Sequence, residues 1–193
     1  MPNTNATKIS LGESLKKLMQ TKRLEKITIQ DLTADCGVSR MAFYYHFKDI
    51  YDLVEWVCME DGKRALQDKK TCDTWQEGIS RIFEVVLENK EFIVNVCRSL
   101  GRERVERYLY RFTYDIVRDV VEEKCRGAGL SEKQKDSITD FYKYGFVGTV
   151  LNWIDHGMKE DYGEIVENMS VMLYENIDHS VRNFKRVTEQ KET

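Results

Sequence analysis

The chain has 193 residues, of which 30 are Lys or Arg and 33 are Asp or Glu, so its formal net charge at pH 7 is −3. This length is enough for a small domain and a larger helical body. No run of about 18 apolar residues occurs, which argues against a membrane-spanning helix. No basic start is followed by an apolar stretch of the secretory type, so we expect a cytoplasmic protein.

Two residue types bound the fold class further. The single proline is Pro2, so no helix breaker interrupts the rest of the chain, and we expect an all-α protein. The cysteines are odd in number and lack CxxC spacing, which predicts neither a metal centre nor a disulfide framework. We interpret most of them as small buried apolar groups, with a redox switch as the alternative; they are Cys36, Cys58, Cys72, Cys97 and Cys125.

The first predicted helix covers about residues 8–23. Its apolar residues recur at i, i+4, i+7 and i+8, which is the spacing of one buried helix face. They are Leu11, Leu15, Leu18 and Met19.

The next segment, residues 28–53, reads as two short helices joined by a tight turn and followed directly by a third. Thr28 is a natural N-cap with Asp31 in the first turn, and Gly37 supplies the positive φ that ends the first of the two short helices. Ser39 caps the next helix, which has only two turns, no acid and an aromatic surface. Such a helix suits the major groove of DNA. The side chains that we expect on its outer surface are Arg40, Met41, Tyr44, Tyr45 and His46.

The string GVSRMAFYYHFKDIYDL resembles the DNA-binding signature of the TetR family of bacterial transcription regulators. Met41 and Ala42 stand where that family usually has a small residue and Thr, and Ile50 where it often has Lys. The resemblance implies an all-α fold with an N-terminal three-helix DNA-binding head and a C-terminal helical bundle for dimerisation and effector binding. We therefore divide the chain into residues 1–53 and 54–193, with a linking helix that reaches about residue 70.

The predicted DNA-binding residues are Thr28, Ser39, Arg40, Met41, Tyr44, Tyr45, His46 and Lys48. Arg40 is the candidate base reader, since Arg can bind guanine O6 and N7 together; a plain phosphate contact is its alternative. The resemblance makes Tyr44 and His46 phosphate donors rather than mere packing groups. Lys48 offers its charge to a phosphate, and the amides that open the next helix offer a dipole end.

The charge is unevenly divided along the chain. Residues 1–50 hold eight basic and five acidic side chains, a net charge of +3, which leaves −6 for the other 143 residues. A duplex needs a local positive face rather than a basic protein as a whole. Ordinary solvated charge would account for so small an asymmetry nearly as well.

Helices are expected through the rest of the chain. One begins with a capping-box spacing from Thr74 to Glu77, a second covers residues 91–100, and a third residues 102–126. Ser131 with Gln134 then predicts a helix that runs to about Met158. The last predicted helix covers residues 163–186.

These last two helices carry the dimerisation hypothesis. Gly145 and Gly148 lie near the middle of the first of them, and two helical glycines within four residues suggest that another backbone or a ligand comes close there. In TetR-like proteins the last two long helices form a four-helix bundle with a second copy, so we expect a homodimer. The alternative is that both apolar stripes are the core of one protomer.

No enzyme motif is present: the chain has no GxSxG, P-loop, HExxH or GxGxxG, and no cofactor or metal is expected. The stretches YYHFKDIYDLVEW and FYKYGFVGTVLNWIDHGMKED resemble the branch of the TetR family typified by DhaS, the dihydroxyacetone kinase regulator.

The predicted function is sequence-specific binding of a near-palindromic operator, as a repressor that a small-molecule effector releases. Its effector cavity would be lined by Phe83, Phe92, Phe112, Tyr142, Phe146 and Trp153. The alternative is a regulator, including an activator, whose C-terminal domain responds to a protein partner.

Overall fold

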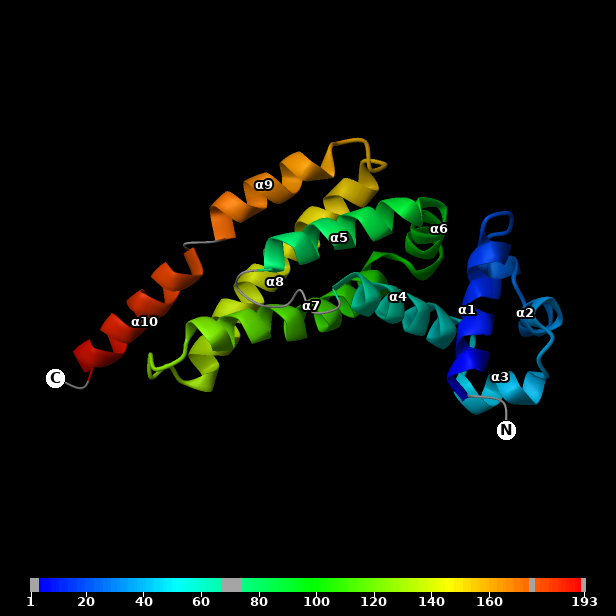
Figure 1. Cartoon of the computed structure of the whole chain (residues 1–193), viewed down its shortest axis with the longest axis horizontal. Coiled ribbons are helices and arrows are strands. Elements are labelled where there is room, and N and C mark those ends of the chain that lie inside the picture. The colour runs from blue at the N-terminus through cyan, green and yellow to red at the C-terminus, as the bar shows by residue number, and fades with distance from the viewer. Residues whose placement is uncertain (1–3, 67–73, 174–175, 192–193) are drawn as a thin grey trace. The chain divides into compact units, whose positions relative to one another are not determined.

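The computed structural model describes residues 4–66, 74–173 and 176–191, and every regular element in these ranges is a helix (Figure 1). The predicted all-α class is confirmed. None of the described helices is both long and apolar enough to cross a membrane. The elements are α1 (Thr4–Met19), the 3-10 helix η1 (Leu24–Lys26), α2 (Ile29–Cys36), α3 (Arg40–His46), α4 (Ile50–Leu66), α5 (Trp75–Glu88), α6 (Lys90–Leu100), α7 (Arg102–Lys124), α8 (Glu132–Asp155), α9 (Tyr162–Leu173) and α10 (Asn176–Lys191).

The chain forms two compact units that interleave along the sequence. The first unit contains residues 1–64 and 88–105, and the second contains residues 65–87 and 106–193. Helix α6 therefore packs with the N-terminal helices, although the sequence division placed it in the C-terminal part. The last two residues of α4 belong to the second unit, and the predicted end of this helix, near Lys70, lies outside the described residues.

In the first unit, α1 packs against α2, α3 and α6, and the predicted stripe on α1 is mostly buried. Leu11 and Leu15 are fully buried, whereas Leu18 is half-buried. A Cβ at Gly12 would lie 3.0 Å from Val57 Cγ2 and 3.3 Å from the ring of Trp56. Gly12 therefore permits the close approach of α4 to α1.

Helix α1 begins and ends about four residues earlier than the apolar pattern predicted. Its C-terminal turn is bound by Asn95 of α6, whose Nδ2 donates to the carbonyls of Met19 (3.2 Å) and Lys22 (2.8 Å). The amide of Leu24 donates to Asn95 Oδ1 at 3.2 Å. A residue more than 70 positions away thus provides hydrogen-bond partners for the backbone groups of the turn after α1.

The second unit has a core shared by α7, α8 and α10. The predicted capping box of Ser131 and Gln134 opens α8, with each residue accepting a bond from the other's backbone amide. Helix α8 ends at Asp155 rather than near Met158, because Gly157 (φ 78°) turns the chain and the Met158 amide donates to the Trp153 carbonyl at 2.9 Å. The single final helix expected over residues 163–186 corresponds to two described helices, α9 and α10; residues 174 and 175 lie outside the described residues.

A network of charged side chains joins α7 to α8. Arg118 binds Glu122 at 2.6 Å and Asp136 at 2.5 Å, and it also pairs with Glu132. Lys135 bridges Glu122 (2.8 Å) and Glu132 (2.9 Å). Hydrogen bonds from Lys135, followed by the contribution of Arg118, hold the pKa of Glu122 below its ordinary value, and Lys135 is also the main cause of the lowered pKa of Glu132.

We expect this network to make the second unit sensitive to acid. A carboxyl whose pKa is lowered by folding stabilises the protein above its ordinary pKa, and that stabilisation is lost as the pH falls through the folded value. Urea unfolding followed at several pH values should show a weaker loss of stability below about pH 5 in Lys135→Met than in the unmodified protein. Lys133→Met, at an exposed position of the same helix, is the control; equal acid dependence in all three proteins would contradict this assignment.

Candidate nucleic-acid interface

The turn between α2 and α3 is formed by local contacts, as the sequence predicted. The Thr28 hydroxyl accepts a hydrogen bond from the Asp31 amide at 3.1 Å, and Asp31 Oδ2 accepts one from the Thr28 amide at 2.9 Å. Gly37 ends α2 with φ 69°, and the Val38 amide donates to the Thr33 carbonyl at 3.1 Å. The chain is thereby redirected into α3.

Helix α3 has a buried face and an exposed face. The Ser39 hydroxyl caps it by accepting from the Ala42 amide at 3.1 Å. Phe43 is fully buried, and Phe47, directly after the helix, packs on Trp56 of α4 with ring centroids 5.7 Å apart. On the other side, Met41 is 83% exposed and Tyr45 is 79% exposed. The buried rings anchor the short helix, while its outer surface remains available to a ligand.

The remaining predicted DNA-binding residues occupy different settings. Arg40 and Lys48 are exposed, Tyr44 is exposed with its ring edge-to-face against Phe43, and His46 is half-buried with its ring 4.9 Å from that of Tyr45. Thr28 and Ser39 are exposed, but their hydroxyls also serve as helix caps. All eight residues lie on the α2–α3 segment or at the start of α4.

The opening turn of α4 is capped by acids. Asp49 Oδ1 accepts from the Asp52 amide, and Asp52 Oδ2 accepts from the Lys48 amide, each at 2.9 Å. These two backbone donors are therefore already used. The first-turn amides of Ile50 and Tyr51 have no acceptor within the helix, and they remain available to a phosphate.

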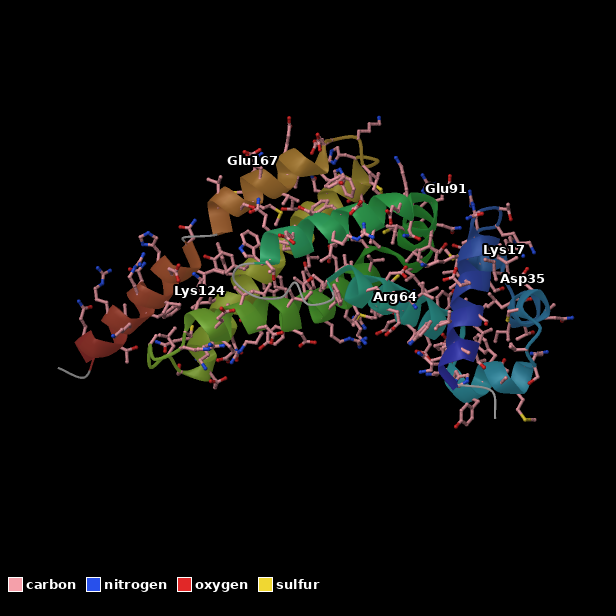
Figure 2. All side chains as sticks on the ribbon, in the orientation of Figure 1. Lys17, Asp35, Arg64, Glu91, Lys124 and Glu167 are labelled. Atoms are coloured by element: carbon pink, nitrogen blue, oxygen red, sulfur yellow. The ribbon has the colours of Figure 1, made fainter. Side chains whose placement is uncertain are left out.

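Several cations of the first unit are paired within that unit, which reduces the positive charge left for a ligand. Lys17 binds Asp35 at 2.6 Å (both labelled in Figure 2), Lys16 binds Asp61 at 2.6 Å, and Lys22 lies 3.7 Å from Asp31. The positive charge available to a ligand is therefore smaller than the number of basic residues in this part of the sequence suggests. Arg40 and Lys48 keep their charge beside the exposed face of α3.

The six aromatic residues predicted to line an effector cavity do not form one cluster. The ring of Phe83 lies 5.0 Å from that of Trp153 and 6.4 Å from that of Phe146. Tyr162 of α9, which is not among the six predicted residues, stacks on Phe83 with ring centroids 6.2 Å apart. We call Phe83, Phe146, Trp153 and Tyr162 the aromatic cluster.

The other three predicted cavity residues lie elsewhere. Tyr142 belongs to the core shared by α7, α8 and α10, Phe112 is half-buried on α7, and Phe92 is buried in the first unit. Helical periodicity shows that each of these residues faces an interior, but it does not show which interior.

One face of α8 is both apolar and exposed. Phe141 is 73% exposed, Tyr144 is also exposed, and a Cβ added at Gly145 or Gly148 would meet nothing within 4 Å. On α9, Val171 is 77% exposed. The glycines of α8 thus approach no other part of the described chain, which leaves this face available to another molecule.

The thiols show little sign of redox chemistry. Burial raises the pKa of Cys36 and of Cys125, and it raises the pKa of Cys58 to about 12. A protonated thiol is a poor nucleophile, which argues against a redox role for these three. Of the described cysteines, however, only Cys125 is fully buried, and Cys36, Cys58 and Cys97 are half-buried. Cys72 lies outside the described residues.

The second unit matches a family of known regulators. The TetR-type family model described as "Transcriptional regulator C-terminal region" matches residues 73–175, which is more than half of the chain. The chain belongs to the TetR family of transcriptional regulators. Proteins of this family are regulators rather than enzymes; they bind operator DNA and form dimers.

Solved structures of TetR-type regulators share the fold. The dihydroxyacetone kinase operon activator DhaS is similar with a TM-score of 0.66 and 16% identity, over 92% of this chain and 97% of that one. A TetR regulator from Streptococcus agalactiae gives 0.58 and 20% identity, over 89% and 94%.

Two curated relatives are similar in sequence over part of their length. The uncharacterised HTH-type regulator YerO of Bacillus subtilis is 26% identical over 112 residues, 51% of this chain and 39% of YerO. The dhaKLM operon activator DhaS of Lactococcus lactis is 23% identical over 92 residues, 48% of this chain and 49% of DhaS. The matched segments thus span less than half of each relative. Together with the fold, they confirm the resemblance to the DhaS-like branch of the TetR family.

Proposed function

We propose that this protein binds operator DNA through α3 as a sequence-specific transcriptional regulator. The observation that carries the proposal is the surface of α3: a helix anchored by buried Phe43 presents Arg40, Met41 and Tyr45 outward. A helix in the major groove reads base edges with such side chains. Arg40 offers a bidentate donor to guanine, and Met41 offers an apolar contact to a thymine methyl group.

We further propose that the phosphate contacts come from residues around this helix. Tyr44 and His46 offer donors at its C-terminal end, and Lys48 adds a charge beside the free amides of Ile50 and Tyr51. Phosphate contacts set the register of a protein on the duplex but carry no sequence information, whereas base contacts do.

This division of roles predicts two different mutant phenotypes. Arg40→Ala should weaken operator binding by about 1–3 kcal/mol and relax the preference at one base pair. Lys48→Ala should weaken binding to operator and random duplex alike and reduce the salt dependence by about one phosphate contact. Fluorescence anisotropy titrations at several salt concentrations measure both effects.

The control for this experiment is Lys26→Ala, which removes an exposed cation of the first unit outside α3. This change should alter neither the operator affinity nor its salt dependence appreciably. If Arg40→Ala weakened operator and random DNA equally, Arg40 would be a phosphate contact rather than a base reader.

The protein is proposed to act as a homodimer formed through the exposed faces of α8 and α9. Phe141, Tyr144 and Val171 expose apolar surface, and Gly145 and Gly148 leave room for a second helix. A two-fold dimer would place two α3 helices in successive major grooves, about 34–36 Å apart, on a near-palindromic operator.

For regulation, we propose a repressor that is released when a small molecule binds in the second unit. The aromatic cluster is the site this proposal favours, because it joins α5, α8 and α9. A ligand could weaken DNA binding only in so far as it prefers the released conformation, and a tenfold loss of DNA affinity requires about 1.4 kcal/mol of such preference.

The alternative is a regulator, including an activator, that responds to a protein partner. Phe83 and Trp153 are almost completely buried and their ring centroids lie 5.0 Å apart, as in the core of a helical domain, and this packing favours the alternative. The relative DhaS is named an activator, which also supports it. An operator-release assay separates the two: release of purified protein by a compound supports the repressor, whereas release or activation only upon addition of a second protein supports the alternative.

A further inference from the structure

A groove of about 660 Å³ lies within the first unit, between residues 19–25 and α6. We call it the α1–α6 groove. Its charged lining consists of Lys22, Arg23, Glu25, Lys90, Glu91 and Arg98. No part of the proposed DNA-binding surface lines it, and the aromatic cluster belongs to the other unit. Its volume falls within the range of small-molecule sites.

The balance of charge in the groove favours an anion. Four cations and two carboxylates line the groove, and one of the cations, Lys22, also lies 3.7 Å from Asp31 outside it. One of these carboxylates, Glu25, is already engaged, because a hydrogen bond from its own backbone amide holds its pKa below the ordinary value. The guanidinium groups of Arg23 and Arg98, in contrast, form no hydrogen bond or ion pair with any residue that the structure describes, although the charge of Arg23 helps to lower the pKa of Glu25. Their guanidinium groups are free to bind a ligand.

The walls of the groove are held in place by hydrogen bonds. Asn95 joins α6 to the turn after α1 through the carbonyls of Met19 and Lys22, and the Ser99 hydroxyl donates to Asn95 Oδ1 at 3.3 Å. The first turn of α6, with Lys90 and Glu91, also lines the groove, so the positive end of that helix dipole is nearby. A site whose donors are fixed in advance loses less entropy on binding.

We propose that the α1–α6 groove binds a small organic anion with two negative charges, of the dicarboxylate or phosphate type, between Arg23 and Arg98. Each guanidinium offers two parallel donors to a carboxylate or phosphate group. The bound anion would bridge the turn after α1 to α6, as Asn95 already does. It would therefore stabilise the first unit in the arrangement that the structure describes.

Calorimetric titration of the full chain with succinate, with its neutral analogue succinamide and with inorganic phosphate tests the proposal. Succinate or phosphate should bind saturably and succinamide should not. The double variant Arg23→Ala/Arg98→Ala should weaken binding at least about tenfold, since two charge-assisted contacts are lost. The control Arg182→Ala/Lys185→Ala removes two exposed cations of α10 and should leave binding unchanged.

Two results would overturn the proposal. One is that neither succinate nor phosphate binds saturably. The other is that Arg23→Ala/Arg98→Ala and the control Arg182→Ala/Lys185→Ala bind the anion with equal affinity. Operator affinity is measured on the same variants without added anion. If Arg23→Ala/Arg98→Ala bound every duplex more weakly and took up no anion, the groove would be a contact for the DNA backbone instead. Unchanged operator binding together with lost anion binding would support the groove and leave the proposed function intact.

Discussion

Replacing Gly148 with glutamate is expected to give a well-folded protein that no longer dimerises and has lost most of its affinity for a two-site operator. Gly148 lies on the exposed face of α8, and a Cβ there meets nothing within 4 Å in the protomer. The helix itself should gain about 0.5–1 kcal/mol, because glycine is a poor helix former. In a dimer, however, the new carboxylate would be buried against a second helix, which is strongly unfavourable.

The loss of DNA affinity should be large. Two heads on one dimer bind two half-sites with an avidity gain of about 10²–10⁴, and a monomer forfeits that gain. Light scattering should give a dimer for the unmodified protein and a monomer for Gly148→Glu at micromolar concentration, with far-UV circular dichroism unchanged. Gln76→Glu, which adds the same charge at an exposed position of α5, is the control. A Gly148→Glu protein that remained dimeric would place the interface elsewhere.

Replacing Phe43 with alanine should lower the free energy of unfolding of the first unit by about 3–5 kcal/mol. Phe43 is fully buried, and its ring contacts those of Tyr44 and Phe47. Without it, α3 has only two turns and too little packing to hold its orientation, so specific DNA binding should be lost as well.

The matched control for this change is Tyr45→Ala on the opposite face of α3. Tyr45 is largely exposed, so its removal should change stability by no more than about 0.5 kcal/mol while still weakening DNA binding. Urea unfolding followed by far-UV circular dichroism compares the two variants, and tryptophan fluorescence adds a signal from Trp56, whose ring packs on Phe47, together with those of Trp75 and Trp153. If the two variants were equally stable, Phe43 would not be the anchor of α3.

The local elements of the helix-turn-helix were predictable because each depends on residues at most four positions apart. Thr28 with Asp31, Gly37, and Ser39 with Ala42 determine where α2 ends and α3 begins through hydrogen bonds and a backbone angle inside one turn. The capping box at Ser131 was predictable for the same reason. The alternation of buried and exposed residues on α3 also follows from helical spacing alone.

Contacts between distant segments were decided only by the tertiary structure. An apolar stripe shows that a helix buries one face, but many other faces along the chain could cover it. Nothing in the sequence indicated that Asn95 would bind the turn after α1, that α6 would join the first unit, or that Tyr162 would stack on Phe83. The pairing of Lys16 and Lys17 with acids of other helices was equally hidden.

The sequence by itself therefore determined the helical class, the caps and the residues that α3 exposes, since these depend on neighbouring residues, whereas it misplaced the ends of α1 and α8 and merged α9 with α10. The tertiary structure decided which core each aromatic residue enters, how much positive charge remains free, and where a groove forms whose Arg23 and Arg98 side chains have no ion pair among the described residues. The physical reason is that side chains far apart in the chain meet only after the helices have packed, and helical periodicity carries no information about which partner they meet.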